Sequence, residues 1–469
     1  MIYRRGHRLN QQNPALAEIE ARAAAMLSVE ARIYTERRPK ALASTQAGNG
    51  FFDGVPMHWM LDWPMPFPMI VDRASGVRLT DVDGNEVVDL CLGDTGAMFG
   101  HGPAPILRAL EGVAHRGLTT MLPSADANVV ASLLVERFGL PRWQIAATAS
   151  DANRFAIRAA RAVTGRRKIL VFDGCYHGSV DETLVDLVDG KTLSRASLLG
   201  QAVDLGENTI SIPFNDEEAL RAALASGEVA CVLAEPVMTN CGMILPEEGF
   251  HDVLRRLTRE AGTLLLLDET HTISSGLGGY TAVHGLEPDI LVMGKPIGGG
   301  IPVSIWGMTF DVAALLDKAR KARETSGHSG IGTTLSGSAL QLACLRASLE
   351  QIVTAETYAR MGRQADVIDE GLRAAIADCG LPWTVTRVGA RLEVVFTDTP
   401  VRNAVEARAA ASSTIESALH LALLNRGFLV TPFHNMILVA PPLEEHEAQG
   451  LVRAYRDVLG ELAATKAAA

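Results

Sequence analysis

Residues 263–304 constrain the fold most, because two apolar runs in this stretch each end in a charged residue. The run 264–267 is followed by Asp268, and the run 290–293 is followed, one glycine later, by Lys295. Short unbroken apolar runs are typical of strands buried in a parallel sheet, although a buried helix segment also fits. Such sheets bind ligands at the carboxyl ends of their strands. Charged groups there are costly unless paired or in use, so Asp268 and Lys295 are predicted to hold the two ends of one cofactor.

Length and charge narrow the class of protein. A chain of 469 residues exceeds one ordinary core and predicts two or three lobes. Its formal charge of -11 argues against nucleic acid as a partner. The six cysteines are scattered without a CxxC pair, which favours reduced thiols over disulfides or a metal site. Without a signal peptide or membrane-spanning run, we expect a cytoplasmic protein with no membrane partner.

From about residue 105, helical stretches alternate with short apolar strands, which is typical of a βαβ sheet wrapped by helices. The predicted strands read RWQIAAT, KILVFDG, VACVLAEP, LLLLDE, DILVMG and VSIWGM. After residue 336, two helical segments precede strand-like pieces at 391–397, 428–431 and 436–439, followed by closing helices. This change predicts a smaller α+β lobe at the C-terminus.

The N-terminal third carries three further signals. Residues 14–37 are helix formers and predict a peripheral arm. Residues 57–68 are irregular and rich in proline, tryptophan and methionine, which favours packing on a surface, an interface or a pocket wall. Asp83-Gly84 between two alternating runs predicts a β-hairpin. We therefore divide the chain into residues 1–75 (arm and irregular segment), 76–335 (large cofactor-binding domain) and 336–469 (connecting helices and small domain).

Eight motifs follow one another between about residues 76 and 459: LTDVDGNEVVDL, GHGPAPILRAL, TASDAN, FDGCYHG, AEPVMTNCG, LLLDE, GKPIGGGIPV and TTLSGSAL. Their order resembles the class III aminotransferases of fold type I, and within them the glutamate-1-semialdehyde aminomutase branch. The resemblance implies an α/β enzyme with a mostly parallel, seven-stranded-type sheet and a smaller α+β domain. It also implies pyridoxal 5'-phosphate (PLP) or its amino form (PMP) as cofactor, and small-molecule amines and carbonyl compounds as substrates.

Two residues carry the catalytic prediction. A Schiff base with a carbonyl cofactor requires a lysine that can also move a proton, and the resemblance assigns this role to Lys295. A surface lysine is the alternative, but the buried run before it and the glycines at 298–300 argue against that. The electron-accepting pyridine works best when a carboxylate keeps its nitrogen protonated, and Asp268 matches that position.

The other cofactor contacts follow from the resemblance. It places Tyr176 on one ring face, Thr270 on the other in place of the commoner valine, and Asn240 near the phenolic oxygen. His177 is the neighbour of Tyr176 in Cys-Tyr-His-Gly and joins the cofactor-binding set. Glu269, beside Asp268, is predicted to be structural.

The phosphate is expected at a helix N-terminus, where unpaired N–H groups and the helix dipole favour an anion. Ala149 and Ser150 fit this place, with Ser150 also predicted as the N-cap. The family usually has glycine where this chain has Ala149, so the extra methyl predicts some crowding of the phosphate. Thr333 and Thr334 match the position that contacts the phosphate from the other subunit, which implies a homodimer with shared active sites.

The substrate side departs from the family pattern. Members that bind a carboxylate from the C-terminal lobe carry an arginine in the turn that is residues 431–436 here, and this turn has none. The acidic gate residue and the N-terminal Ser-Pro-Val-Arg element of the aminomutases are also missing. We therefore predict an aminotransferase working by ping-pong half-reactions. The alternatives are an aminomutase and a catalytically silent binding protein on the same fold.

The predicted substrate pocket favours apolar groups beside the reacting amine or carbonyl. Arg391 offers either a carboxylate contact or an outward-facing strand residue, and His434 either a pocket residue or a solvated one. The pocket residues predicted from the sequence are Trp59, Trp63, Arg391, Phe433 and His434.

Overall fold

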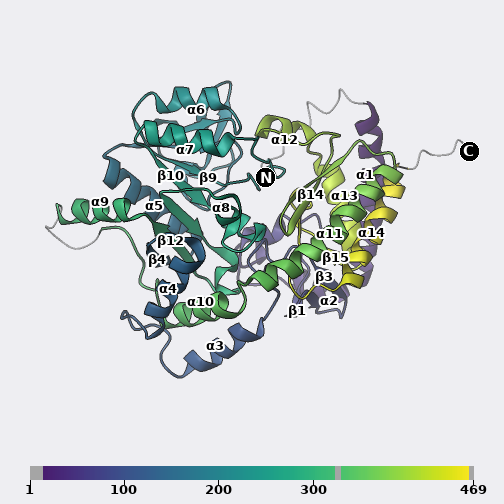
Figure 1. The fold of residues 1–469 in the computed structure, drawn as a ribbon. Helices are drawn as coiled ribbons and strands as arrows, with labels where there is room; N and C mark the ends of the chain where they lie inside the picture. The colour runs from purple at the N-terminus through teal and green to yellow at the C-terminus, as the bar shows by residue number, and fades with distance from the viewer. Residues whose placement is uncertain (1–13, 323–328, 464–469) are drawn as a thin grey trace, which may run out of the picture. The chain divides into compact units, whose positions relative to one another are not determined.

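The structure is a computed structural model that describes residues 14–322 and 329–463. The chain forms two compact units (Figure 1). The first combines Met1–Gly102, Ala359–Pro400 and Val405–Ala469, and the second combines Pro103–Tyr358 with Val401–Ala404. The division of the chain at residues 75 and 335 stays a prediction.

In the part of the chain that is described, the second unit is built on a seven-stranded sheet. In spatial order its strands are β4 (Arg142–Ala146), β12 (Ser304–Met308), β11 (Ile290–Met293), β10 (Leu264–Asp268), β9 (Val229–Ala234), β5 (Lys168–Phe172) and β8 (Thr209–Ile212). The pairs from β11 to β8 are parallel, and β12 is antiparallel to both of its neighbours. The predicted α/β class and mostly parallel sheet are confirmed, and only the edge strand β8 was not foreseen.

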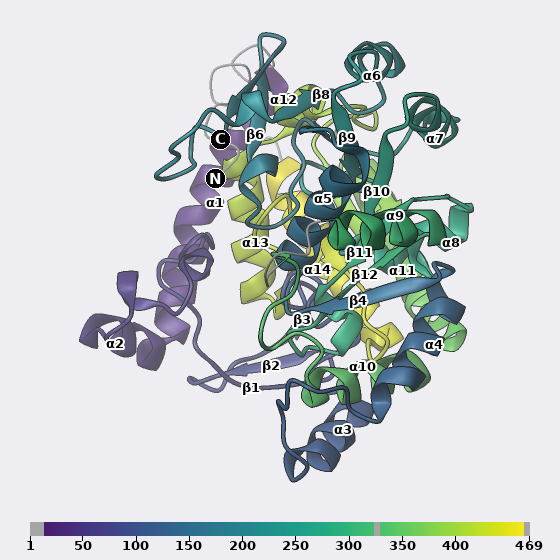
Figure 2. The ribbon, with the colours of Figure 1, turned by 90° about the vertical axis from the view of Figure 1, so that its left-hand side faces the viewer.

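Helices cover both faces of this sheet (Figures 1 and 2). Helix α5 (Ala149–Thr164) packs across the central strands, while α6 (Glu217–Leu224) and α7 (Phe250–Glu260) lie over the other face. The chain crosses from β4 to β5 in one direction along the sheet and returns from β8 through β9 to β10. Because parallel crossovers are right-handed, the two directions place helices on opposite faces. All parallel strands therefore end at one edge of the sheet.

Helix α5 begins at the end of β4 and carries the residues predicted to bind phosphate. Its N-cap is Thr148, whose hydroxyl accepts from the N–H of Asp151 at 3.1 Å. The prediction of Ser150 as N-cap is wrong, because the helix starts at Ala149, two residues earlier than that cap requires. Gly165 closes the helix in the left-handed conformation. The buried face is lined with alanines, which lets the helix lie close to the strands.

The remaining elements of the second unit surround this core. They are α3 (Ala104–Ala114), α4 (Asp126–Phe138), η5 (Asp181–Thr183), β6 (Val185–Val188), β7 (Lys191–Ser194), η6 (Leu205–Glu207), η7 (Thr272–Ser275), α8 (Gly279–His284), η8 (Lys295–Gly298), α9 (Phe310–Lys321) and α10 (Ala339–Gln351). Helix α11 (Ala355–Asp378) begins in this unit and continues into the first.

The first unit contains two small sheets. One has the order β1 (Val71–Ser75), β2 (Arg78–Asp81), β3 (Glu86–Asp89) and β15 (Phe428–Leu429), and the other β13 (Thr384–Val388), β14 (Arg391–Val395) and β16 (Ile437–Leu438). The predicted hairpin is confirmed, since β2 and β3 pair antiparallel around Asp83-Gly84. The other elements are α2 (Pro39–Ala47), η3 (Phe52–Gly54), η4 (His58–Leu61), α12 (Ala404–Ala410), α13 (Ser413–Asn425) and α14 (Glu445–Ala463).

Helix α1 (Pro14–Arg37) has the bounds predicted from the sequence, but it is not a peripheral arm. It packs along α13. The buried Glu30 accepts from Asn425 and forms an ion pair with Arg426, and the hydroxyl of Tyr34 donates to the carbonyl of Phe67. These buried contacts make α1 part of the core of the first unit. Over the described ranges, no helix is both long and apolar enough to cross a lipid bilayer.

Candidate functional site

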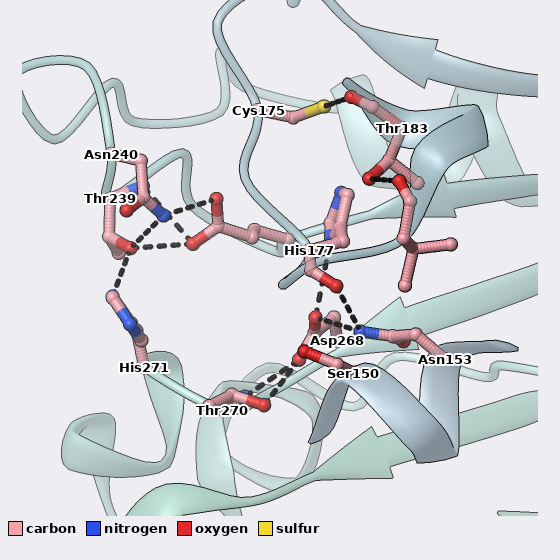
Figure 3. A network of polar contacts seen from close by, with 12 residues as sticks. Ser150, Asn153, Cys175, His177, Thr183, Thr239, Asn240, Asp268, Thr270 and His271 are labelled. Carbon is pink, nitrogen blue, oxygen red and sulfur yellow. Dashed lines mark hydrogen bonds and ion pairs between the residues drawn. The ribbon is translucent and has the colours of Figure 1, made fainter. Parts of the chain in front are cut away.

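Asp268 ends β10 at the carboxyl edge of the sheet and accepts four hydrogen bonds (Figure 3). Its Oδ2 accepts from Asn153 Nδ2 at 2.8 Å and lies 3.0 Å from Nδ1 of His177. Its Oδ1 accepts from the hydroxyl of Thr270 at 2.6 Å and from the Thr270 N–H at 3.1 Å. These four contacts, two at each oxygen, hold Asp268 in a single orientation.

These contacts also fix the charge of the pair. Burial alone would raise the pKa of Asp268, but the hydrogen bond and positive charge of His177, with the hydrogen bonds from Thr270 and Asn153, lower that pKa to about 2. Burial disfavours the charged form of His177, yet Cys175 and Asp268 raise the pKa of the imidazole to about 10. The pair is therefore an ionised carboxylate and an imidazolium at neutral pH. A fixed negative charge thus stands at the floor of the site.

The N-terminus of α5 offers an anion site a short distance along the same edge. No residue in the described ranges accepts from the N–H groups of Ala149 and Ser150. Two close approaches shape this place: a Cβ at Gly178 would come within 3.0 Å of the Ser150 Cβ, and one at Gly294 within 2.8 Å of the Ala149 Cβ. The Ala149 methyl therefore faces Gly294, the residue before Lys295. Unpaired N–H groups at the start of a long helix favour a bound anion.

Lys295 follows β11, the parallel neighbour of β10, and starts η8. Its backbone is left-handed, with φ of 46°, a conformation that residues other than glycine rarely adopt. The side chain is half-buried, and Nζ lies 2.5 Å from Nε2 of His271. The predicted position of both charged residues at neighbouring strand ends is what the structure has.

A second group of polar contacts lies beyond His271 (Figure 3). Nδ1 of His271 is 2.7 Å from Oγ1 of Thr239, which in turn donates to Oε2 of Glu235 at 2.5 Å. Asn240 donates from Nδ2 to Oε1 of Glu235 at 3.1 Å. These residues come from the segment after β9 and the segment after β10, so the polar contacts join two adjacent strand ends.

The site brings together a buried carboxylate, the anion site at the N-terminus of α5 and a lysine amine at one edge of the sheet. The family model "Aminotransferase class-III" matches residues 61–459. The chain belongs to this family. Glutamate-1-semialdehyde 2,1-aminomutase 2 of Bacillus cereus (strain B4264) is 34% identical over 379 residues, 78% of this chain and 84% of that protein.

Solved structures agree with the family. A glutamate-1-semialdehyde-aminomutase from Pseudomonas aeruginosa PAO1 is 44% identical with a TM-score of 0.92, covering 94% of this chain and 99% of that chain. An omega-transaminase from Sphaerobacter thermophilus is 26% identical with a TM-score of 0.83, covering 91% and 99%. The resemblance, the fold type I architecture, the enzyme class and PLP or PMP as cofactor are confirmed for this class-III aminotransferase. A lysine-to-alanine variant of the Pseudomonas protein was solved in complex with PMP.

The residues of the site fit this cofactor. PLP carries a phosphate, a pyridine nitrogen and a carbonyl carbon, and the site offers unpaired N–H donors, a charged carboxylate and a lysine amine at separate points of one edge. Two buried polar atoms, Nε2 of His177 and Oδ1 of Asn153, also lack a hydrogen-bond partner in the described structure. Residues of the described chain do not assemble a group of three or more His, Cys, Asp or Glu that could hold a metal.

Other residues predicted to bind the cofactor lie close by. Thr270 is buried and its hydroxyl is used by Asp268, so the residue that replaces the common valine supports the carboxylate. Tyr176 is half-buried, immediately before His177. Glu269 is fully buried and accepts from the hydroxyl of Thr272 and the N–H of Tyr280, which agrees with the predicted structural place. Burial raises the pKa of its carboxyl group.

Thr333 and Thr334, predicted to reach a partner's phosphate, lie in an exposed turn before α10. The hydroxyl of Thr333 is 2.7 Å from that of Ser336. Leu335, the next residue, is 58% exposed. The turn is therefore on the surface of its own unit.

The five predicted substrate residues belong to the first unit. Arg391 on β14 is 1% exposed and donates to the hydroxyl of Thr95, so it is not an outward-facing residue. His434 is not a solvated turn histidine, because Nδ1 lies 2.8 Å from the buried carboxylate of Glu393. Glu393 is two residues from Arg391 on β14, so His434 contacts the strand that also carries Arg391. Their roles towards a substrate stay predictions.

The three aromatic residues of the predicted pocket differ in their surroundings. Trp59 lies on η4 and is 38% exposed. Trp63 packs edge-on against His420, with ring centroids 5.4 Å apart. Phe433 is half-buried in the turn before His434.

Sequence reasoning missed three residues of the candidate site: Asn153, Thr239 and His271. Asn153 lies on the buried face of α5, one turn from Ala149, and it bonds both Asp268 and the carbonyl of His177. A lone amide on an alanine-rich face is a signal that could have identified it. His271 gave no such signal, because its contact with Lys295 depends on the turn after β10.

Proposed function

We propose that this class-III aminotransferase moves an amino group between an amine or amino acid donor and a keto or aldehyde acceptor in two ping-pong half-reactions. One observation carries the proposal. Asp268, which His177 holds ionised, ends β10, and Lys295 follows the adjacent parallel strand β11. A fixed carboxylate and a reactive amine at one sheet edge are what this chemistry needs.

The residues divide the work as follows. PLP, when bound, supplies a pyridine ring that accepts the electron pair of the bond broken at the substrate carbon. Asp268 keeps the ring nitrogen protonated, and the N–H groups of Ala149 and Ser150 hold the phosphate. The amine of Lys295 would hold the cofactor at its carbonyl carbon and, when free, would move a proton at the substrate carbon. Tyr176, Thr270 and Asn240 bound the ring.

We also infer a homodimer. The turn of Thr333 and Thr334 is exposed and is followed by the exposed Leu335, which suits a surface that meets a second copy and its phosphate. We infer a cytoplasmic location from the free thiols of the six cysteines. Sedimentation of the purified chain tests the dimer, and a monomer that still binds PLP tightly would contradict it.

An aminomutase is the second candidate, favoured by the names of relatives that are 44% and 34% identical. In that reaction one molecule serves as both donor and acceptor. Transamination ranks first because the chain lacks an arginine at residues 431–436 and lacks the acidic gate residue of the aminomutases.

The deciding experiment is a donor screen with the PLP-loaded, full-length chain. Amino acids and carboxylate-free amines are supplied side by side without an acceptor, and conversion of PLP to PMP is followed by absorbance. We expect rapid conversion with at least one donor and none in the Lys295→Ala variant.

A parallel sample receives glutamate-1-semialdehyde as the single substrate. Isomer formation there, with no conversion by separate donors, would establish the aminomutase instead. If no compound is converted, both the aminotransferase and the aminomutase proposals are rejected.

A further inference from the structure

Four side chains form a continuous line of hydrogen-bonding contacts that starts at the reactive amine. Lys295 Nζ lies 2.5 Å from His271 Nε2, and His271 Nδ1 lies 2.7 Å from Thr239 Oγ1. Thr239 Oγ1 lies 2.5 Å from Oε2 of Glu235. Every link is within hydrogen-bonding distance, so the amine is connected to a carboxyl group through two groups that can both donate and accept.

Three of the four side chains are buried away from water. Glu235 is 4% exposed, Thr239 2% and His271 7%. The charged groups that act on Glu235 are His177 and Asp268, and Asn240 donates to its second oxygen. Burial raises the pKa of Glu235, although the charge of His177 acts in the opposite direction. A proton on this carboxyl group is therefore less unfavourable than on an exposed glutamate.

When Glu235 is ionised, the hydrogen bonds of the line can all be donated in the direction from Lys295 towards Glu235. The Thr239 hydroxyl then donates to Glu235 and accepts from Nδ1–H of His271. Neutral His271 consequently accepts at Nε2 from the ammonium of Lys295. This arrangement holds the lysine protonated, which is the form that cannot attack a carbonyl carbon.

The donors point the other way when Glu235 is protonated. Its O–H donates to Thr239, Thr239 donates to Nδ1 of His271, and Nε2–H of His271 donates to the lone pair of a neutral lysine amine. The two arrangements differ by one proton moved from Nζ to Oε2. At each intermediate residue one bond to hydrogen breaks and one forms: His271 loses the hydrogen on Nδ1 and gains one on Nε2, and the Thr239 hydroxyl exchanges its hydrogen. No electrons are transferred and nothing else is consumed.

We propose that Glu235, Thr239 and His271 form a proton relay that takes a proton from Lys295 and returns it. His271 touches the reacting atom and is a catalytic residue, whereas Thr239 and Glu235 are positioning residues that act through it. The relay rests on the proposed function for its purpose, because the lysine amine must alternate between neutral and protonated forms during each half-reaction. Its existence is a property of the protein alone and is testable without turnover.

The test measures the reactivity of the Lys295 amine in the full-length chain, after hydroxylamine and dialysis have removed the cofactor. Acetic anhydride acylates only neutral amines, and peptide mass spectrometry compares Lys295 with Lys168. Lys168 pairs with Glu228 at the surface, at 2.8 Å, and serves as the reference. Labelling of Lys168 gives the pH profile of an amine that lies outside these contacts.

With a working relay, Lys295 becomes neutral by passing its proton to Glu235. The share of molecules in that state does not depend on pH. We expect Lys295 labelling to change less than about threefold between pH 8 and 6. In Glu235→Gln and His271→Gln the profile should become as steep as that of Lys168, with labelling at pH 6 at least about tenfold slower. Thr239→Val should behave likewise, and Thr239→Ser, which restores the hydroxyl, should recover the flat profile.

Two results would overturn the relay: a steep profile in the wild-type chain, or faster labelling in Glu235→Gln. The second is what a glutamate acting only as a negative charge would give, since removing that charge favours the neutral amine. If Glu235→Gln does not fold, His271→Gln and the Thr239 pair decide. His284→Gln, which changes an exposed histidine of α8, should match the wild type. A flat profile in a chain that converts no donor would reject the aminotransferase proposal and keep the relay.

Discussion

Nδ1 of His177 lies 3.0 Å from Oδ2 of Asp268, and neither side chain is reached by solvent to any useful extent. Removing one partner of such a pair leaves an isolated charge in a medium of low dielectric constant. The pair therefore acts as a unit: His177 maintains the ionised state of Asp268, and Asp268 maintains the charge of His177.

His177→Gln should lower the free energy of unfolding by about 3–5 kcal/mol at pH 6. The folded pKa of His177, about 10, lies above the unfolded value of about 6.5. Its stabilising contribution is therefore fully present below pH 6.5 and is lost as the pH rises through 10. Urea unfolding of variant and wild type from pH 6 to 10 should show the gap shrinking with pH. A gap that stays constant would mean that the charge of His177 is not involved.

Asp268→Asn should still bind cofactor but lose at least about a thousandfold in turnover, since an amide cannot keep the pyridine nitrogen protonated. The variant keeps the size of the side chain, so retained binding and lost rate separate electrostatics from folding. Stopped-flow measurement of a single half-reaction gives the rate. Near-normal turnover would show that another carboxylate has this role.

The position of Asp268 and Lys295 was predictable from the sequence, because parallel strands end at one edge and each apolar run fixes its own end. The bounds of α1 followed from its helix formers, and six of the seven strands of the large sheet followed from their apolar runs. The burial of Arg391 and Glu393 did not, since the alternation Arg-Leu-Glu-Val indicates one exposed face, whereas every residue of β14 is buried.

The contact of Lys295 with His271 was also beyond sequence reasoning. It depends on two turns, η7 after β10 and the left-handed backbone at Lys295, neither of which leaves a residue pattern that specifies side-chain direction. The N-cap was missed for a related reason, because Thr148 and Ser150 are both good caps and only the hydrogen bond to Asp151 distinguishes them.

Gly178→Ala should weaken PLP binding by at least about tenfold, because the added methyl must displace Ser150 from the phosphate cup. The Cβ would meet the Ser150 Cβ at 3.0 Å and its Cα at 3.1 Å. Gly190→Ala is the matched control: its φ of 74° is close to the 82° of Gly178, but it has open space around it. Fluorescence titration with PLP measures both. Equal losses in the two variants would assign the effect to backbone strain alone.

Glu416, a buried glutamate of the first unit, gives a pH dependence that comes from burial rather than from an ion pair. Burial and the neighbouring Glu393 raise the pKa of Glu416 to about 7, although the charge of His434 opposes them. The folded value lies above the unfolded value of about 4.3, so the stabilising contribution of the protonated form is fully present below pH 4 and is lost as the pH rises through 7.

Wild-type stability should therefore fall between pH 4.5 and 7.5 relative to Glu416→Gln, by roughly 2–3 kcal/mol. The amide imitates the neutral carboxyl group and cannot ionise. Urea unfolding across this pH range measures the difference, with Glu370→Gln, an exposed change on α11, as the control. Parallel stability profiles of the wild type and Glu416→Gln would show that Glu416 ionises at the same pH in the folded and unfolded chains.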